Sequence, residues 1–206
     1  MKQLIVDYLP FQITPEQINE SIKENNGKLV VRGVLQRAEA KNQNGRIYPR
    51  ETLMREAKKY EKEFVNEKRA MGELDHPESS VVNLQNVSHN ITEMHFEGEN
   101  LLGTVEILTT PSGNILRELF KNGIKLGISS RGMGSVETVT EADGTPTTKV
   151  GNDFELIAFD FVSNPSTHGA FMYPLQENVD KTQTQGRTCG QYCKAEDLIN
   201  KIIRGE

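Results

Sequence analysis

Apolar and polar residues alternate along several segments of the chain, and a period of two predicts β-strands. Such segments lie at 87–96, 101–108, 124–131, 133–141 and 153–163, and the β-branched residues of 28–38 predict a further strand. In 49–70 and 110–123, apolar residues instead recur every three or four positions, which predicts amphipathic helices. The overall pattern therefore predicts a β-rich α+β body.

The helix expected at 110–123 carries start and stop signals. Ser112 or Asn114 could cap its first turn, and Gly123 suits the position just past its last turn. The apolar residues expected to face the core are Ile115, Leu116, Leu119 and Phe120. In the following segment, Ile124, Leu126 and Ile128 are expected to share the core face of a strand.

Composition divides the chain into three parts. Residues 1–27 mix apolar and polar residues and end in the turn signal "ENNGK", which indicates an N-terminal segment. The periodic segments fill residues 28–175, the predicted main domain. Residues 176–206 are mostly polar and lack periodicity, so we expect a linker and a tail with a short helix at its end.

Charge and composition exclude several classes of function. A net charge of −5 argues against general nucleic-acid binding, which needs a basic stripe. No apolar run approaches the roughly 20 residues that span a bilayer, and the N-terminus does not match a secretory signal, so we expect a cytosolic protein. Cys189 and Cys193 form an isolated C-x3-C pair, so neither a zinc site nor a cofactor is expected.

The segment "GIKLGISSRGMG" (123–134) places two serines and an arginine among glycines. If strand alternation continues through it, Ser129 and Arg131 share the face away from the apolar interior, and Ser130 faces inward. A nucleophilic serine needs exposure, a nearby base and donors for an oxyanion, and Gly132 would let the chain bend there. By itself the segment also fits a polar strand end with a glycine bend.

A nucleophilic serine also needs a base and a group that orients the base. His76, in "GELDHPESS", is the candidate base because imidazole titrates near neutrality; a solvated surface histidine is the alternative. Asp160 shares a face with apolar residues of 153–163, where an ionised carboxylate needs a partner, so it is the first candidate for the orienting acid. A strand-edge acid facing solvent is the alternative. Glu73 and Asp75 are poorer candidates, since a carboxylate immediately before His76 in an extended chain points the other way.

Four motifs, "NGRIYPRE", "GELDHP", "GISSRGMG" and "FDFVSNPST", occur in this order in the prohead proteases of large tailed phages. Over roughly residues 28–174 the chain resembles this family, which is more remotely similar to the herpesvirus assemblins. The resemblance implies a serine endopeptidase with an assemblin-like fold, a small β-barrel with flanking helices. It places the base at His76 and the nucleophile, the serine of a G-[IL]-S pattern, at Ser129, with the adjacent Ser130 as the alternative.

The third member of the site varies among the relatives. Alignment from the "NP" motif falls nearer Ala158, and Asp160 lies two residues on and on the same face, so it is a plausible substitute. Amide groups near Arg131 and Gly132 would stabilise the oxyanion. The side chain of Arg131 could hold a bridging water or attract an acidic substrate residue.

The family cleaves after glutamate in Leu/Ile-x-Glu sequences. "LQE" ends at Glu177, where the periodic body gives way to the tail, so we expect self-cleavage there. The resemblance implies capsid scaffold and major head proteins as substrates, a homo-oligomer, and a location inside the prohead in the host cytoplasm, without a membrane or direct nucleic-acid contact. The alternatives are a non-catalytic scaffold component of the prohead and a metal hydrolase using His76, Asp75 and Glu73.

Overall fold

The structure, a computed structural model, describes residues 3–11, 15–42, 44–77, 79–124, 126–140, 144–163 and 172–174. All of them belong to the first of two compact units, Met1–Gln176. The second unit, Glu177–Glu206, lies outside the described residues, and so do the expected cleavage site at Glu177 and both cysteines. Within the described part, no helix has the length and apolar character needed to cross a bilayer.

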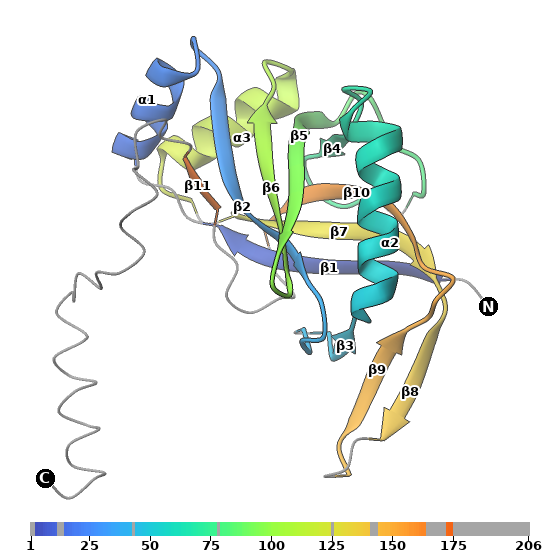
Figure 1. The fold of residues 1–206 in the computed structure, drawn as a ribbon. Helices are drawn as coiled ribbons and strands as arrows, with labels where there is room; N and C mark the ends of the chain where they lie inside the picture. The colour runs from blue at the N-terminus through green and yellow to red at the C-terminus, as the bar shows by residue number, and fades with distance from the viewer. Residues whose placement is uncertain are drawn as a thin grey trace, which may run out of the picture. The chain divides into compact units, whose positions relative to one another are not determined.

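Antiparallel strands dominate the fold (Figure 1). One sheet has the order β1–β7–β10 and consists of β1 (Gln3–Phe11), β7 (Leu126–Gly134) and β10 (Glu155–Val162). A second has the order β11–β2–β6–β5–β4 and consists of β11 (Met172–Pro174), β2 (Leu29–Arg37), β6 (Asn100–Ile107), β5 (Val87–Glu97) and β4 (Met71–Glu73). A smaller sheet contains β3 (Arg46–Ile47), β9 (Pro146–Val150) and β8 (Val136–Thr140).

The two larger sheets cross each other and enclose the core (Figure 1). They join where Leu74 and Phe161 form a parallel bridge and the Asp75 amide donates to the Phe161 carbonyl at 2.7 Å. The α+β class is confirmed, but the ladders of the described strands do not close into the predicted β-barrel. The physical reason is that β1 pairs along the whole of β7 and forms the edge of the β1–β7–β10 sheet. It does not also pair with β2, which would link this sheet to the five-stranded one.

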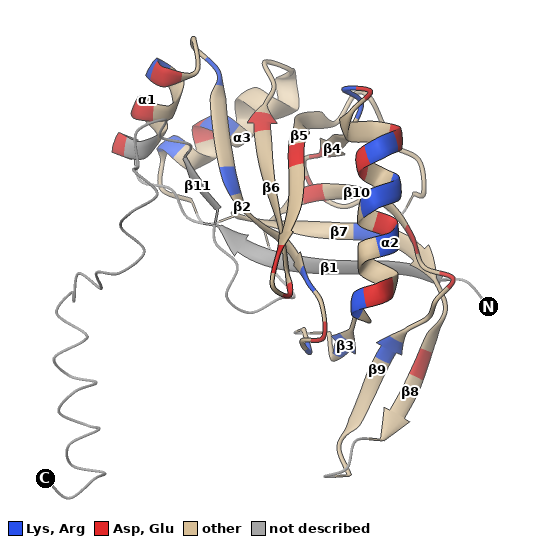
Figure 2. Ribbon diagram, viewed as in Figure 1, with Lys and Arg blue, Asp and Glu red and all other residues tan. Residues whose placement is uncertain are grey.

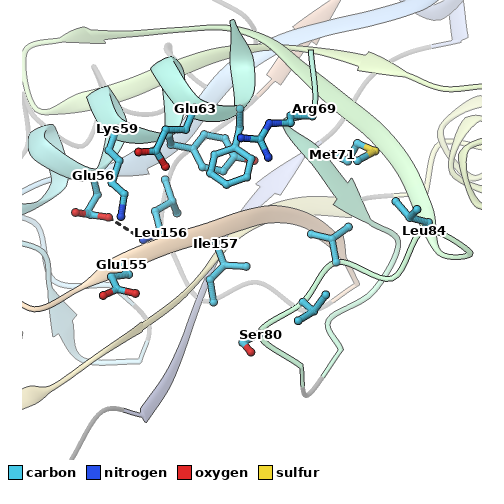
Figure 3. A pocket seen from close by; sticks show the side chains of 14 residues that line it. Glu56, Lys59, Glu63, Arg69, Met71, Ser80, Leu84, Glu155, Leu156 and Ile157 are labelled. Atoms are coloured by element: carbon cyan, nitrogen blue, oxygen red, sulfur yellow. Dashed lines mark hydrogen bonds between the residues drawn. The ribbon is translucent and has the colours of Figure 1, made fainter. Parts of the chain in front are cut away.

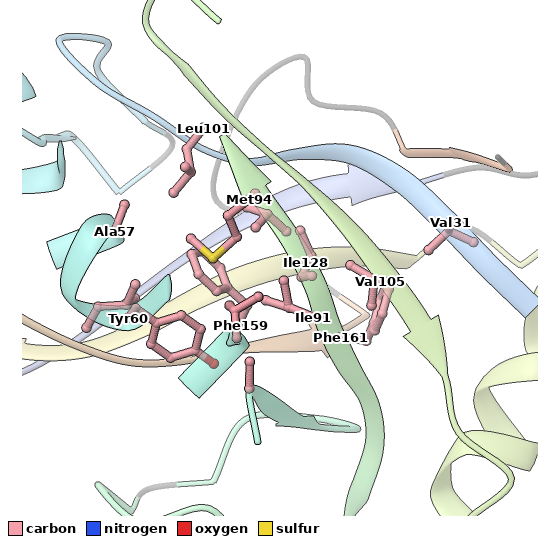
Figure 4. Packing of buried hydrophobic residues seen from close by; sticks show 14 of the residues in the cluster. Val31, Ala57, Tyr60, Ile91, Met94, Leu101, Val105, Ile128, Phe159 and Phe161 are labelled. Atoms are coloured by element: carbon pink, nitrogen blue, oxygen red, sulfur yellow. The ribbon is translucent and has the colours of Figure 1, made fainter. Parts of the chain in front are cut away.

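Apolar side chains from both sheets fill the space between them (Figure 4). The buried residues include Val31, Ile91, Val105, Ile128, Phe159 and Phe161. Phe159 and Phe161 come from β10, the strand that also carries Asp160, so the packing of this strand fixes the position of its polar residue. The core and the candidate site are therefore built on opposite faces of one strand.

In the described part of the chain, three helices flank the sheets: α1 (Pro15–Glu24), α2 (Arg50–Tyr60) and α3 (Pro111–Lys121). A π-helical turn, η1 (Glu61–Val65), continues α2. The helix predicted over 49–70 therefore changes its hydrogen-bonding pattern after Tyr60 and ends at Val65. Its apolar face is confirmed, because Leu53, Ala57 and Tyr60 are buried. Figure 2 shows basic and acidic residues following one another along α2, as expected for a helix with one face in solvent.

Some local predictions for α3 and β7 were wrong. The hydroxyl of Thr110, rather than Ser112 or Asn114, caps α3 by accepting from the Gly113 amide at 3.1 Å. Leu116 and Phe120 are buried, but Ile115 is 54% exposed because the buried face of α3 is narrower than its apolar stripe. Ile124, expected in the core, is 45% exposed since it precedes the first residue of β7.

The side chain of His89 in β5 packs between Gly72 of β4 and Phe159 of β10. Its Nε2–H donates to the Phe159 carbonyl at 2.9 Å, and its Nδ1 accepts from the Ser88 hydroxyl at 2.9 Å. A Cβ at Gly72 would lie 1.9 Å from the Phe159 oxygen and 2.3 Å from the His89 ring, so only glycine fits there. Burial lowers the pKa of His89 to about 4, and the ring stays neutral in the fold.

This buried imidazole predicts an acid-sensitive fold. An unfolded histidine takes up a proton near pH 6.5 but His89 does so only near 4, so the unfolding free energy falls as pH drops between these values, by up to roughly 3 kcal/mol. We expect His89→Gln to flatten this dependence in urea unfolding at pH 7.0, 5.5 and 4.5. Replacing the exposed His95 by Gln is the control and should keep the wild-type slope. Equal slopes for wild type and His89→Gln would contradict the account.

Candidate active site

Ser129 lies on β7, the middle strand of its sheet, directly opposite Asp160 on β10. Residues that face each other across an antiparallel pair project from the same side of the sheet. Arg131, two residues along β7, projects from that side as well. One stretch of sheet surface therefore presents a hydroxyl, a carboxylate and a guanidinium, as strand alternation predicts.

His76 reaches this surface from the segment that follows β4. Asp75 has a left-handed backbone with a φ of 71°, which Asp tolerates better than most residues. Its carboxylate accepts from the His76 amide at 2.9 Å, and Pro77 favours an extended backbone at His76. The "LDHP" sequence therefore turns the chain and directs the imidazole onto the sheet.

Three of the four motif segments each bring one side chain into a single hydrogen-bonded chain. The Ser129 hydroxyl lies 2.8 Å from His76 Nε2, and His76 Nδ1 lies 2.9 Å from Asp160 Oδ2. A carboxylate can only accept, so Nδ1 carries the proton of the neutral ring and Nε2 is free to accept from the serine. This geometry allows the imidazole to take the serine proton as a general base.

Asp160 is fully buried yet held as an anion. Burial by itself would raise its pKa, but hydrogen bonds from His76 and Arg131, the Arg131 charge and the Glu73 amide outweigh it and lower the pKa below its usual range. The Glu73 amide donates to Asp160 Oδ1 at 2.9 Å. The carboxylate can thus orient His76 and balance a proton gained on its ring.

Arg131 does not take the role expected of it. Its side chain is fully buried, with Nε at 2.8 Å from Asp160, an Nη at 3.0 Å from Glu73 and the other Nη at 2.6 Å from the Ser79 carbonyl. All three nitrogen atoms point to protein acceptors, so the guanidinium faces the buried acids rather than a substrate.

The backbone at this point is also committed to the sheet. Arg131 has Val6 and Ala158 as strand partners, and Gly132 has Ile5 and Leu156. Strand amides point along the sheet toward neighbouring strands. The expectation that amides near Arg131 and Gly132 stabilise an oxyanion therefore has no support in this geometry.

The structure separates the two adjacent serines. Ser130 projects from the other face of β7, where the Gln36 side-chain amide donates to its hydroxyl at 2.8 Å. Ser129 is the serine beside the imidazole. Both are nearly inaccessible, so the expected exposure of Ser129 is wrong; the His76 side chain that contacts it is 17% exposed.

Sequence reasoning missed Glu73 as a partner of Arg131. Glu73 was considered only as a poorer orienting acid for His76, whereas in the structure its carboxylate accepts from Arg131 at 3.0 Å. The local pattern gave no signal for this contact, because alternation groups Glu73 with Met71 and Asp75 on one face of the strand. A buried carboxylate needs a cation, and Arg131 is that cation.

A pocket of about 510 Å³ lies between α2, η1, β10 and the segment after His76, and it is not lined by Ser129, His76 or Asp160 (Figure 3). Its apolar lining includes Tyr60, Phe64, Met71, Leu84, Leu156 and Ile157. Lys59, Arg69 and three glutamates also contribute to it. Among the residues that the structure describes, no group of three or more His, Cys, Asp or Glu side chains is arranged to hold a metal ion.

Known proteins share both the sequence pattern and the fold. Residues 6–184 match the family described as prohead core protein serine protease. The prohead core protein protease of Enterobacteria phage T4 is 30% identical over 159 residues, which are 76% of this chain and 72% of that protein. The solved structure of the bacteriophage T4 capsid assembly protease, gp21, is similar with a TM-score of 0.66 at 25% identity, over 80% of this chain and 99% of that chain. The family match covers most of the chain and agrees with the motifs, and the chain therefore belongs to the prohead core protein serine proteases of bacteriophages.

Proposed function

We propose that the chain is a serine endopeptidase with Ser129 as nucleophile, His76 as general base and Asp160 as the orienting acid. The observation that carries this proposal is the unbroken contact chain from the Ser129 hydroxyl through both His76 nitrogens to Asp160. His76 Nε2 takes the hydroxyl proton as the Ser129 oxygen bonds to the scissile carbonyl carbon. The protonated ring then gives this proton to the leaving amine, and water hydrolyses the acyl-enzyme.

The proposed substrates are capsid scaffold and head proteins, cut after glutamate in Leu/Ile-x-Glu sequences during prohead maturation. The family membership supports the substrate class. The pocket beside β10 supports the preference for an apolar residue near the cut, since Leu156, Ile157 and Leu84 offer it an apolar surface. We also propose that the protein is a homo-oligomer and that its fold is remotely similar to that of the assemblins.

Self-cleavage after Glu177 is part of the same proposal. The sequence Leu175–Gln176–Glu177 has the required pattern and stands at the boundary between the two compact units. Cutting there would separate the protease from its polar tail. The reaction is expected to occur inside the prohead, where enzyme and substrates are confined together.

Exchanging each serine tests the nucleophile. We expect Ser129→Ala to lower the rate of scaffold cleavage by at least ~10³-fold, because among the described residues Ser129 is the one whose hydroxyl contacts His76 Nε2. Ser130→Ala is the matched control and should cleave at a rate close to wild type. It should lose about 1–3 kcal/mol of stability, because the buried Gln36 amide loses its acceptor. Gel analysis of purified scaffold and urea unfolding give the two readouts. Normal cleavage by Ser129→Ala would favour the non-catalytic scaffold role instead.

Mass spectrometry of the purified protein tests self-cleavage. The active wild-type chain should end at Glu177, whereas Glu177→Gln and Ser129→Ala should keep an intact C-terminus. Glu177→Gln should still cleave added scaffold, since it leaves Ser129, His76 and Asp160 unchanged. An active wild-type protein with an intact C-terminus would reject self-cleavage at this position.

A further inference from the structure

Arg131 binds two buried carboxylates at once. Its Nε and one Nη contact Asp160 at 2.8 and 3.2 Å, and the same Nη contacts Glu73 Oε1 at 3.0 Å. The side chains of all three residues are fully buried. One cation is therefore shared between two anions in a region with little water to screen them.

Among the side chains that the structure describes, the groups packed around this cluster add no further buried charge. Tyr60 from α2 has its pKa raised by burial, and His89 from β5 has its pKa lowered to about 4, so both are neutral at neutral pH. Asp75, next to His76, uses its carboxylate on the His76 backbone amide. The cluster of Glu73, Asp160 and Arg131 thus carries a net charge of −1, which a proton on His76 would neutralise.

Without the charge of Glu73, Arg131 would cancel Asp160 alone, and a protonated His76 would face a neutral cluster. In the proposed mechanism His76 becomes positively charged in the transition state in which Ser129 attacks the carbonyl. A cluster with a net negative charge stabilises this transition state. Glu73 therefore affects His76 without touching it, by drawing part of the Arg131 charge away from Asp160.

Glu73 also bears on the position of His76. Its Oε1 accepts from the Asn83 amide at 3.0 Å, and Arg131 donates to the Ser79 carbonyl at 2.6 Å. Both contacts hold the segment that follows His76. A neutral Gln could make the same Oε1 contacts, yet the second oxygen of Glu73, Oε2, is buried without a hydrogen-bond partner in the described part of the chain. Leaving a carboxylate oxygen unsatisfied is costly, so anchoring alone does not explain an acid here.

We propose that Glu73 is a positioning residue of the active site that sets the net charge around Asp160 and thereby the proton affinity of His76. The inference rests on the proposed function. It concerns the proton affinity of the base, His76, whereas the proposed function concerns which residues react.

Glu73→Gln tests the charge, because it keeps the shape and the Oε1 acceptor. We expect kcat to fall about 10- to 100-fold with KM changed less than about threefold, since substrate contacts are unaltered. The acid limb of the pH profile of kcat/KM should move about 1 unit to lower pH, because a protonated His76 is less stabilised. Glu106→Gln is the control. It removes the carboxylate of a β6 residue that pairs with Lys28, and it should leave the acid limb in place.

Glu73→Asp tests rescue, because it restores the charge with a shorter side chain. Its acid limb should return to the wild-type position even if its unfolding temperature is lower. An unmoved acid limb in Glu73→Gln, or an equally displaced limb in Glu73→Asp, would overturn the inference and leave Glu73 a structural residue. If Glu73→Gln does not fold, Glu73→Asp decides: an acid limb at the wild-type position supports the inference, and a displaced limb overturns it. The proposed function fails separately, by normal cleavage in Ser129→Ala.

Discussion

The buried ion pair between Arg131 and Asp160 is the interaction on which the candidate site depends. Both side chains are fully buried, and losing one partner of such a pair typically costs about 3–5 kcal/mol. The guanidinium keeps Asp160 ionised, binds Glu73 from β4 and holds the Ser79 carbonyl of the segment after His76. One side chain therefore connects β4, β7, β10 and the segment that carries the base.

The fold supplies the precision that this cluster needs. Ser129 and Asp160 are cross-strand neighbours on β7 and β10, so ladder hydrogen bonds fix their separation. Gly72 lets β4 approach the Phe159 carbonyl, and the bridge between Leu74 and Phe161 brings the chain to β10 just before His76. Catalytic groups held in place in advance need little reorganisation when the reaction begins.

Local patterns predicted the main strands, α2, α3 and the faces of the site, but they missed β1 and α1 within residues 1–27. Alternation placed Ser129 and Arg131 together and Ser130 opposite, and it identified Asp160 as an acid among apolar residues that required a partner. The pairing of His76 with Ser129 came from the family resemblance, because 53 residues separate them and no local pattern encodes that contact. Side-chain partners across sheets were missed for the same reason: Glu73 binds Arg131 58 residues away, and Gln36 binds Ser130 94 residues away. The burial of Ser129 and the open arrangement of the sheets depend on packing of whole elements, which periodicity does not report.

The most direct test of the account is covalent labelling of the active protein with a peptidyl phosphonate that carries a glutamate-like side chain next to phosphorus. The phosphorus should bond to the hydroxyl that His76 activates, and peptide mass spectrometry identifies the modified residue. The account predicts one adduct, on Ser129, which is lost in His76→Ala. An adduct on Ser130, or equal labelling of His76→Ala, would contradict it.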